Sequence, residues 1–372
     1  MRLRAVLAIL AVTSVAVTAA CGSAGEAAAS AAPYSVSVSC RDAPSDAGRL
    51  QDAINASRPG EVIDIGGGTC LLTRGITVLP DRALTGASTT GTVLRQEASM
   101  KYVLASTAYV SNSTTTGGPL SIRNLTVACN GSGRTDGIIT MNWQADVENV
   151  DVTDCGGSGI VDSAAAQNGA SIRNTSVNSR FDNNFISGSG QYGFDVADNG
   201  HAVTDGYLEN NQISSSALDA IHLGDASGWD ISGNHLYGDG QDGIYAARLY
   251  GTTIAGNYIE DFGARQASGT WYGIVSTAQG GIGSTIDGNK VFNDGGETGD
   301  AVHVYIAVTQ VNYGTSYLSV TGNVIVGASQ RDVGFSFSGG ANHLMVAAAG
   351  NLVSDVGTVT QRFGSASVSV GT

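Results

Sequence analysis

Lysine is almost absent from this chain of 372 residues, which contains only Lys101 and Lys290. Charged residues of all kinds make up 13% of the sequence, and 32 acidic side chains outnumber 18 lysines and arginines. The resulting net charge of −14 argues against nucleic-acid binding, because contact with phosphate backbones requires a basic surface. We therefore expect no nucleic-acid partner.

Proline is also scarce, with five residues, whereas glycine reaches 52. The glycines follow no Gly-X-Y period, which excludes a collagen-like chain, and the low proline content argues against disorder. Abundant glycine in a chain that is 42% hydrophobic favours a folded protein with many tight backbone turns.

The N-terminus has the features of an export signal. Arg2 and Arg4 precede a short apolar run, 5–17, and small residues follow up to residue 20. We predict a signal peptide over 1–20, which is too short to span a membrane as a stable helix. Cys21 stands where a bacterial lipoprotein carries its lipid, although Thr18 replaces the usual leucine. The Ala/Ser/Gly-rich segment 21–38 would be a tether. The expected product is a secreted bacterial protein or a cell-surface lipoprotein, bound to the membrane only through that lipid.

Four cysteines remain after Cys21, and an even number in an exported chain predicts disulfides. We expect the pairs Cys40–Cys70 and Cys129–Cys155. A metal cluster is the alternative, but no CxxC or Cys/His spacing supports it.

A repeat of two short strand patterns runs through the remaining chain. The first unit places an asparagine between apolar residues; its copies contain Asn124, Asn149, Asn174, Asn211, Asn234, Asn257, Asn289, Asn323 and Asn351. The second unit sets a glycine or alanine before an apolar residue; its copies end at Ile138, Ile160, Phe194, Ile221, Ile244, Ile274, Val302 and Phe335. Such short units cannot form long helices, and each can bury its apolar side only by stacking on the next. The asparagines suit a tight bend, where they tolerate a left-handed backbone and pair from coil to coil.

These repeats predict an all-β solenoid over 39–372. Residues 46–56 form an amphipathic pattern that would cap its open N-terminal end as a helix. The arrangement resembles the pectate-lyase-like superfamily, which implies a single-stranded right-handed parallel β-helix and a polysaccharide-active, monomeric protein. The resemblance covers about residues 45–355 and is specific for the fold, not for the activity.

Alignment of the second units predicts a polar patch on the outer surface. If the apolar residue of each unit points inward, the next residue points outward. Asp195, His222 and Tyr245 then stack on three consecutive coils, with Ile139, Val161 and Val275 on the flanks. Three residues further along lie Asp198, Asp225 and Arg248, and His303 falls in the first column beyond Val275. A carboxylate beside an imidazole favours acid–base chemistry, although a solvated polar sheet is the simpler interpretation.

One local pattern is more specific. The sequence from Tyr192 to Asp195, Tyr-Gly-Phe-Asp, resembles part of the Tyr-Gly-Phe-Asp-Pro-His-Glu motif of secreted alginate C5-epimerases. The resemblance implies that Tyr192 and Asp195 are catalytic. The family's histidine is missing, because Val196 and Ala197 replace Pro-His, and His222 on the next coil is the candidate to substitute.

The leading hypothesis is a lyase or C5-epimerase acting on a uronate-containing glycan. His222 would be the base, Tyr245 or Tyr192 the acid, and Arg248 the group that neutralises the substrate carboxylate. Asp198 and Asp225 would bind substrate together with Ca²⁺, and Trp271 and Tyr272 would offer faces for sugar stacking.

Two alternatives stay open. In a glycoside hydrolase, Asp198 and Asp225 on adjacent coils would lie about 5 Å apart, as in retaining enzymes. Alternatively, the scaffold is a surface binding module or a cyclase for a small molecule such as a natural product, held in a groove lined by aromatic residues.

Overall fold

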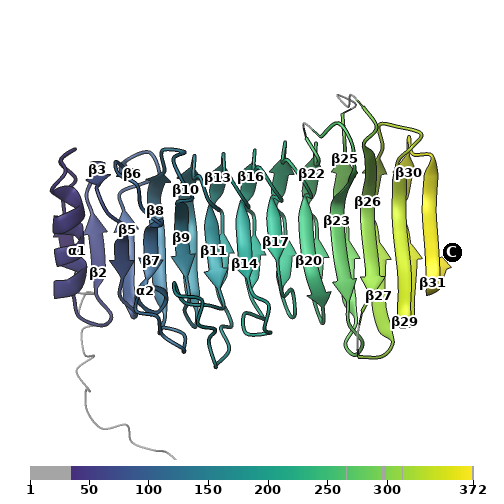
Figure 1. Cartoon of the computed structure of the whole chain (residues 1–372), viewed down its shortest axis with the longest axis horizontal. Coiled ribbons are helices and arrows are strands. Elements are labelled where there is room, and N and C mark those ends of the chain that lie inside the picture. Colours follow the sequence, from purple (N-terminus) through teal and green to yellow (C-terminus); the bar gives the residue numbers. More distant parts are fainter. Residues whose placement is uncertain (1–34, 265, 295–298, 312, 371–372) are drawn as a thin grey trace, which may run out of the picture. The chain divides into compact units, whose positions relative to one another are not determined.

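The computed structural model describes residues 35–264, 266–294, 299–311 and 313–370, and short strands wind through them in stacked coils (Figure 1). The first strand, β1 (Ser35–Val38), pairs in parallel with β2 (Val62–Ile65). The body therefore begins at Ser35, inside the segment expected to be a tether. The predicted signal peptide and Cys21 lie outside the described residues. No helix in the described part of the chain is long and apolar enough to cross a membrane.

Each coil contributes to three faces, which we name A, B and C in chain order, and successive coils pair in parallel within each face. Face A contains β2, β5 (Arg82–Gly86), β12 (Arg180–Asp182), β15 (Tyr207–Glu209), β18 (Asp230–Ser232), β21 (Thr253–Ala255), β24 (Ser284–Asp287) and β27 (Ser316–Thr321). Face B contains β3 (Gly68–Leu72), β6 (Thr92–Gln96), β13 (Phe185–Ser187), β16 (Gln212–Ser214), β19 (His235–Tyr237), β22 (Tyr258–Glu260), β25 (Lys290–Phe292), β28 (Val324–Val326) and β30 (Leu352–Ser354).

Face C, which faces the viewer in Figure 1, contains β4 (Ile76–Val78), β7 (Tyr102–Ser106), β9 (Asp136–Thr140), β11 (Ile160–Ser163), β14 (Phe194–Ala197), β17 (Ile221–Leu223), β20 (Ile244–Leu249), β23 (Thr270–Ala278) and β26 (Val302–Gln310). Four long strands bend across two faces. β8 (Leu120–Ala128) and β10 (Ala145–Thr153) cover A and B, whereas β29 (Val333–Ala349) and β31 (Thr358–Val370) cover C and A.

The N-terminal end of the stack is closed by α1 (Asp46–Ala56), as the amphipathic pattern predicts. Leu50 and Ile54 on this helix are fully buried. Their burial removes the end of the apolar core from water, which a stack of strands cannot do by itself. A second, short helix, α2 (Thr107–Val110), follows β7 on face C.

The bend from face A to face B uses two successive asparagine positions. The first adopts a left-handed backbone, with φ of 55° at Asn124 and 56° at Asn210, and glycine takes it over in later coils. The second forms a buried ladder: the side-chain N–H of Asn211 donates to Asn234 Oδ1 at 3.0 Å, and that of Asn234 donates to Asn257 Oδ1 at 2.9 Å. The ladder runs through Asn184, Asn211, Asn234, Asn257, Asn289, Asn323 and Asn351. The predicted coil-to-coil pairing is confirmed.

Asn174 does not belong to this repeat, contrary to the prediction. Face A pairs Asp146 with Arg180, so this coil is lengthened by the loop that contains Asn174. That asparagine instead donates to Thr116 Oγ1 at 2.7 Å, in another loop.

The inward column of face C agrees with the predicted alignment from Ile138 to Ile274. It differs at the next coil, where Ile274 pairs with Ile306 and not with Val302. Tyr305, which is fully buried, stands there in place of the glycine or alanine that marks the other coils. The alignment returns to the predicted residue at Phe335, the partner of Ile306.

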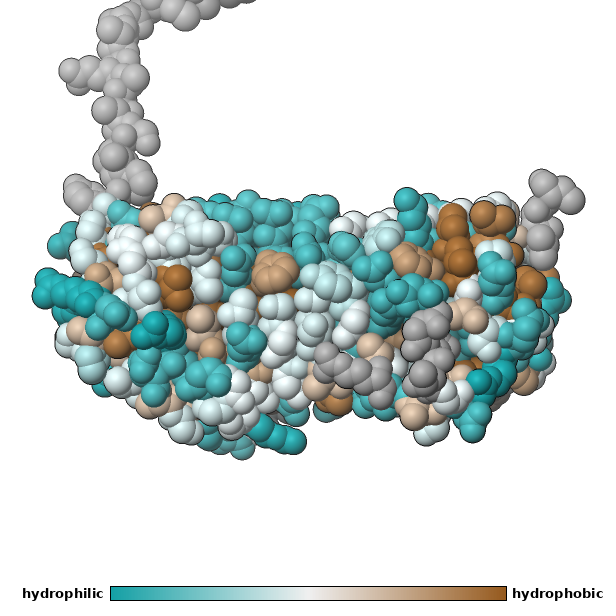
Figure 2. Space-filling model, turned by 90° about the horizontal axis from the view of Figure 1, so that it is seen from above, coloured by the Kyte–Doolittle hydropathy of each residue, from teal (hydrophilic) through white to brown (hydrophobic). Residues whose placement is uncertain are grey.

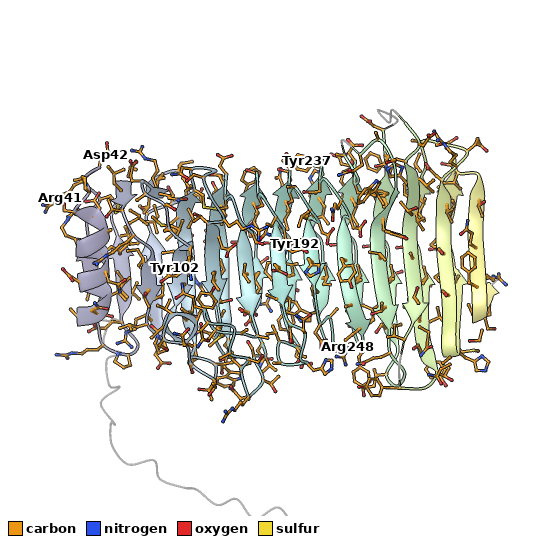
Figure 3. The ribbon with its side chains drawn as sticks, in the orientation of Figure 1. Arg41, Asp42, Tyr102, Tyr192, Tyr237 and Arg248 are labelled. Atoms are coloured by element: carbon orange, nitrogen blue, oxygen red, sulfur yellow. A yellow bond between two sulfur atoms is a disulfide. The ribbon has the colours of Figure 1, made fainter. Side chains whose placement is uncertain are left out.

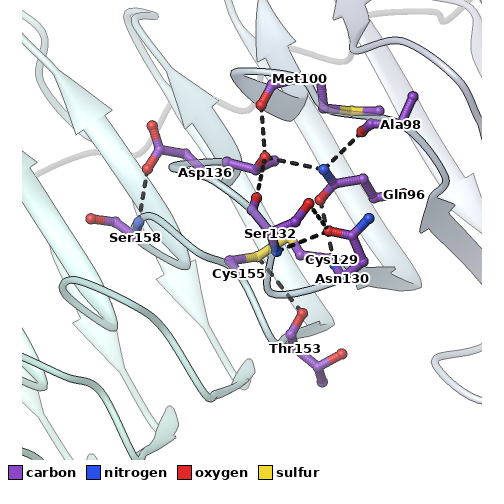
Figure 4. The surroundings of a disulfide bond; sticks show 11 residues. Gln96, Ala98, Met100, Cys129, Asn130, Ser132, Asp136, Thr153, Cys155 and Ser158 are labelled. Atoms are coloured by element: carbon purple, nitrogen blue, oxygen red, sulfur yellow. Dashed lines mark hydrogen bonds between the residues drawn. A yellow bond between two sulfur atoms is a disulfide. The ribbon is translucent and has the colours of Figure 1, made fainter.

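Both predicted disulfides are present, Cys40–Cys70 and Cys129–Cys155. Each joins adjacent coils near the N-terminal end of the stack. Figure 4 shows the second, which links the turn after β8 to the turn after β10. The bonds agree with an exported protein, because disulfides persist in oxidising compartments.

Candidate active site

The predicted column on face C is formed by β14, β17 and β20. Asp195 pairs with His222, and His222 pairs with Tyr245. Oδ1 of Asp195 lies 2.9 Å from Nδ1 of His222. A carboxylate can only accept a hydrogen bond, so Nδ1 carries the proton and the lone pair of Nε2 is left free. The His222 side chain is 23% exposed and Asp195 is 14% exposed, which leaves the imidazole accessible to a substrate.

Two tyrosines sandwich this imidazole. The ring centroid of Tyr192 lies 4.2 Å from that of His222 with 15° between the planes, and Tyr245 lies 4.9 Å away with 10°. Figure 3 shows Tyr192 near the middle of face C. Burial raises the pKa of Tyr192, and the nearby carboxylates of Asp219 and Asp195 raise it further. Tyr192 therefore keeps its proton at neutral pH and can act as an acid.

A row of carboxyl groups runs beside the column, and the sequence pattern does not reveal it. Asp136, Asp219 and Asp242 each precede the inward residue of their coil by two positions. Burial raises the pKa of Asp136 and Asp219 to about 6 and that of Asp242 to about 7. Each Oδ1 accepts a backbone N–H of the following coil, from Ser158, Asp242 and Tyr272 respectively; Figure 4 shows the Asp136–Ser158 bond. In sequence, Asp before Gly or Ala is typical of a turn, which concealed the place of Asp219 and Asp242 beside His222.

The other half of the predicted patch forms a separate cluster. Asp198 is buried, and its carboxylate accepts the backbone N–H groups of Gly200, Ala202 and Val203. It therefore shapes the loop that follows β14. Both carboxylate oxygens of Asp198 are thus engaged by the backbone of this loop, so we assign the residue no catalytic step.

Asp225 and Arg248 meet His201, a residue that the sequence analysis did not single out. Nδ1 of His201 lies 2.8 Å from Asp225 Oδ2, and its Nε2 accepts from the Arg248 guanidinium. Arg248 also donates to Gln279 Oε1 at 3.0 Å, and Figure 3 shows it toward the lower end of face C. Burial raises the pKa of Asp225. Because these contacts engage Arg248, the predicted role of neutralising substrate carboxylate is not supported.

The column is apolar on both sides of the three polar coils. On the N-terminal side, Ile139 and Val161 pack with Ala105 under Tyr102 and Tyr109. On the C-terminal side, Val304, Ala307 and Val333 form a second cluster, against which Tyr272 and Val275 pack. The titratable side chains of the column, Asp195, His222 and Tyr245, thus span about 10 Å along the stack at ~4.8 Å per coil.

His303 does not lie in the column. The coil shift described above pairs it with Trp271, and it is buried against Phe262 with a ring separation of 5.3 Å. Although burial opposes the change, hydrogen bonds from His303 and Ala328 lower the pKa of Asp332. His303 thus serves the core, and its predicted substrate contact is wrong.

The two proposed sugar platforms differ in their surroundings. The indole N–H of Trp271 donates to the carbonyl of Ser268 at 3.0 Å, so the ring packs on its own preceding loop. Tyr272 follows Asp242 in the row beside the column, and burial raises its pKa. Tyr272 remains a candidate substrate contact, half-buried at the edge of the site.

The part of the chain that runs from β9 into β29 matches a known family. A family model for the right handed beta helix region matches residues 136–348, more than half of the chain. The chain belongs to the right-handed β-helix family. A search of curated proteins finds no match.

Solved β-helix structures resemble this one at low sequence identity. The mannuronan C-5 epimerase AlgE4 A-module of Azotobacter vinelandii is 16% identical, with a TM-score of 0.60 over 87% of this chain and 95% of the other. The alginate lyase of Paenibacillus sp. str. FPU-7 is 16% identical, with a TM-score of 0.54 over 89% and 98%. Tailspike protein 2 of bacteriophage CBA120 is 14% identical, with a TM-score of 0.52 over 87% and 44%. At these identities the likeness establishes the right-handed β-helix fold.

Calcium does not fit the residues expected to hold it. Asp198 is buried and accepts three backbone N–H groups. Asp225 accepts from the backbone N–H and the hydroxyl of Ser227 and also contacts His201. Within the described ranges, no group of three or more His, Cys, Asp or Glu side chains has the arrangement of a metal site. We therefore assign no chemical step to a cation at these residues.

Proposed function

We propose that this β-helix protein is an exported polysaccharide-active enzyme that removes the proton next to the carboxylate of a uronate sugar, as a lyase or a C5-epimerase. The observation that carries the proposal is the imidazole of His222, oriented by Asp195 and enclosed by Tyr192 and Tyr245. An oriented imidazole with a free Nε2 and a neighbouring protonated phenol is the pair of groups that general acid–base catalysis requires.

The chemistry follows from these groups. Nε2 of His222 takes the C5 proton, and the electron pair of the broken C–H bond delocalises into the carboxyl group. In a lyase, the pair then forms the C4–C5 double bond, the C4–O bond breaks, and a tyrosine gives its proton to the leaving oxygen. In an epimerase, a tyrosine returns a proton to the opposite face of C5. Asp195 stabilises the imidazolium formed in the first step.

The short polar span favours recognition of a short stretch of glycan. Among the described residues, the titratable side chains Asp195, His222 and Tyr245 occupy three consecutive coils of the column, and apolar clusters lie on both sides of them. The likeness to an alginate epimerase and an alginate lyase supports a scaffold able to hold such a substrate, while the activity itself stays our proposal.

The apolar flanks also favour a second candidate. A small molecule with apolar groups would contact Tyr102 and Tyr109, which pack on Ile139 and Val161, on one side. It would contact Tyr272 and Val275 on the other side, with His222 and the remaining tyrosines between them. The same acid–base groups would then promote a cyclisation.

The test is turnover by the full chain on uronate polymers, neutral polymers and their oligosaccharides. Absorbance near 235 nm and reducing ends would rise together for a lyase, and ¹H NMR would detect a change of C5 configuration for an epimerase. His222→Ala should abolish either signal, whereas His235→Ala on face B should leave it unchanged. Reducing ends without absorbance would contradict the proposal and indicate hydrolysis.

A further inference from the structure

The carboxyl row beside His222 has no role in the proton transfers described above. Asp219 and Asp242 belong to consecutive coils and lie between Tyr192 and Tyr272 in the same register. Only 5% of Asp219 is exposed, and Asp219 influences His222, Asp195 and Asp242 electrostatically. The two carboxyl groups are therefore part of the wall of the site.

Each of these carboxyl groups uses only one oxygen within the protein. Oδ1 of Asp219 accepts the Asp242 N–H at 3.1 Å, and Oδ1 of Asp242 accepts the Tyr272 N–H at 2.8 Å. The Oδ2 atoms make no hydrogen bond with the described residues, and neither is sealed from solvent as an unpaired atom. Two carboxyl oxygens are thus available to a ligand beside the catalytic imidazole.

We infer that Asp219 and Asp242 bind the carboxylate of the substrate as neutral carboxylic acids, each donating an O–H from Oδ2. The inference rests on the proposed function and specifies how an acidic protein would hold an acidic sugar. A hydrogen bond from a neutral acid to a carboxylate is charge-assisted and strong. It takes the role first expected of Arg248, whose guanidinium is engaged by His201 and Gln279.

Burial and the neighbouring carboxyl groups favour the protonated forms of Asp219 and Asp242 at mildly acidic pH. Burial is the main cause that raises the pKa of Asp219 to about 6 and that of Asp242 to about 7. The ionisable groups that face Asp219 are Tyr192, Asp195, His222, Asp239 and Asp242, and those that face Asp242 are Asp219, His222 and Tyr272. Among these only His222 can carry positive charge, and the surrounding carboxyl groups favour the neutral form.

The inference predicts that affinity for an acidic sugar falls as pH rises, because the donors are lost. Calorimetry on the full chain would use trisaccharides of mannuronate and of galacturonate, with their methyl esters as uncharged controls. From pH 5 to pH 8 the acid should lose up to roughly 1000-fold in affinity, about 100-fold from Asp219 and about 10-fold from Asp242, since each pH unit above the pKa costs about tenfold. The ester should change little.

Variants separate the role of the proton from a structural role. Asparagine at both positions, in the double variant Asp219→Asn with Asp242→Asn, keeps a neutral N–H donor at every pH and should hold the affinity for the acid nearly constant up to pH 8. Asp219→Ala and Asp242→Ala should weaken it at every pH. Asp136→Asn, two coils before Asp195, is the matched control and should keep the wild-type pH dependence.

The outcomes also distinguish this inference from the proposed function. Falling affinity with pH in the His222→Ala variant, without turnover by wild type, would support the inference and contradict the proposed function. Turnover with affinity independent of pH, or the same loss of affinity in the double asparagine variant as in wild type, would overturn the inference. Failure of both trisaccharides to bind would overturn it too.

Discussion

The ring of Tyr192 lies 4.2 Å from the ring of His222 and within 15° of parallel to it, although the two residues belong to successive coils. The stack places a phenol with a raised pKa beside an imidazole whose other nitrogen is held by Asp195. Parallel pairing of β14 with β17 creates this contact, and it brings acid and base to one surface.

Removing the hydroxyl of Tyr192 should slow turnover without disturbing the stack. We expect Tyr192→Phe to lower kcat about 10²-fold, the lower range for loss of a general acid, with little change in melting temperature. Tyr237→Phe, on face B, is the matched control and should keep wild-type rates. Full activity of Tyr192→Phe would assign the acid to Tyr245, which the corresponding Tyr245→Phe variant would then show.

Asp195→Asn should remove the charge that orients His222 while keeping the size of the side chain. Loss of the carboxylate allows the wrong imidazole tautomer, so kcat should fall about 10²-fold or more. The measurement is the pH–rate profile of this variant beside that of Asp182→Asn, an outward residue on face A. An unchanged rate for Asp195→Asn would show that the 2.9 Å contact has no part in catalysis.

Asp162 makes stability depend on pH in a direction opposite to that of a salt-bridged carboxylate. It is fully buried, and burial raises its pKa from 3.8 to about 7 against hydrogen bonds from Thr140 and Ser179. The folded state thus binds this proton more tightly than the unfolded state. The stability contribution is full below about pH 4 and is lost as pH rises to about 7.

Asp162→Asn should therefore stabilise the protein at pH 8, by on the order of a few kcal/mol, and have little effect near pH 4. Denaturant unfolding at the two pH values is the measurement. Equal changes in the free energy of unfolding at both pH values would show that Asp162 binds its proton equally well in the folded and unfolded states.

The register of the active column could be predicted because its coils carry apolar residues without interruption. Between Phe194 and Ile244, every inward position is marked by a glycine or alanine before it, so Asp195, His222 and Tyr245 align without ambiguity. The prediction failed at His303 because Tyr305 occupies the position that is glycine or alanine in the other coils. It failed at Asn174 because a loop there mimics the asparagine unit.

Other parts of the site could not be predicted, because they depend on loop paths and on burial. His201 joins Asp225 through a loop whose course the sequence does not specify. Asp219 and Asp242 resemble ordinary turn residues, and only their burial beside His222 reveals raised pKa values. Strand periodicity determines which residues share a column, whereas desolvation depends on everything packed around them.

The asparagine ladder should carry a measurable part of the stability. Asn234 accepts the backbone and side-chain N–H groups of Asn211 and donates to Leu208 and Asn257. Asn234→Ala leaves several of these buried groups unpaired and should cost about 2–4 kcal/mol, at ~1–3 kcal/mol per group with partial relaxation. Asn210→Gly, at the neighbouring left-handed position, should be tolerated, since glycine adopts that backbone readily. Equal losses in both variants would contradict a specific role of the ladder.

The exposed hydrophobic residues of the last coils provide a region in which substitutions should leave the site unaffected. Figure 2 shows hydrophobic side chains gathered toward the C-terminal end of the stack, and Leu352 and Phe363 are among the large apolar residues exposed there. Both lie several coils from His222, so polar replacements at them serve as general controls for the active-site variants.

The most direct test of the central claim is exchange of the C5 proton in D₂O, followed by ¹H NMR on mannuronate and galacturonate oligosaccharides. If His222 is the base, wild type should introduce deuterium at C5 of recovered or epimerised sugar, or form the unsaturated product. His222→Ala should do neither while still binding the sugar. Exchange or elimination that persists in His222→Ala would contradict the account. So would a wild-type protein that binds the oligosaccharide but neither exchanges the C5 proton nor forms the unsaturated product.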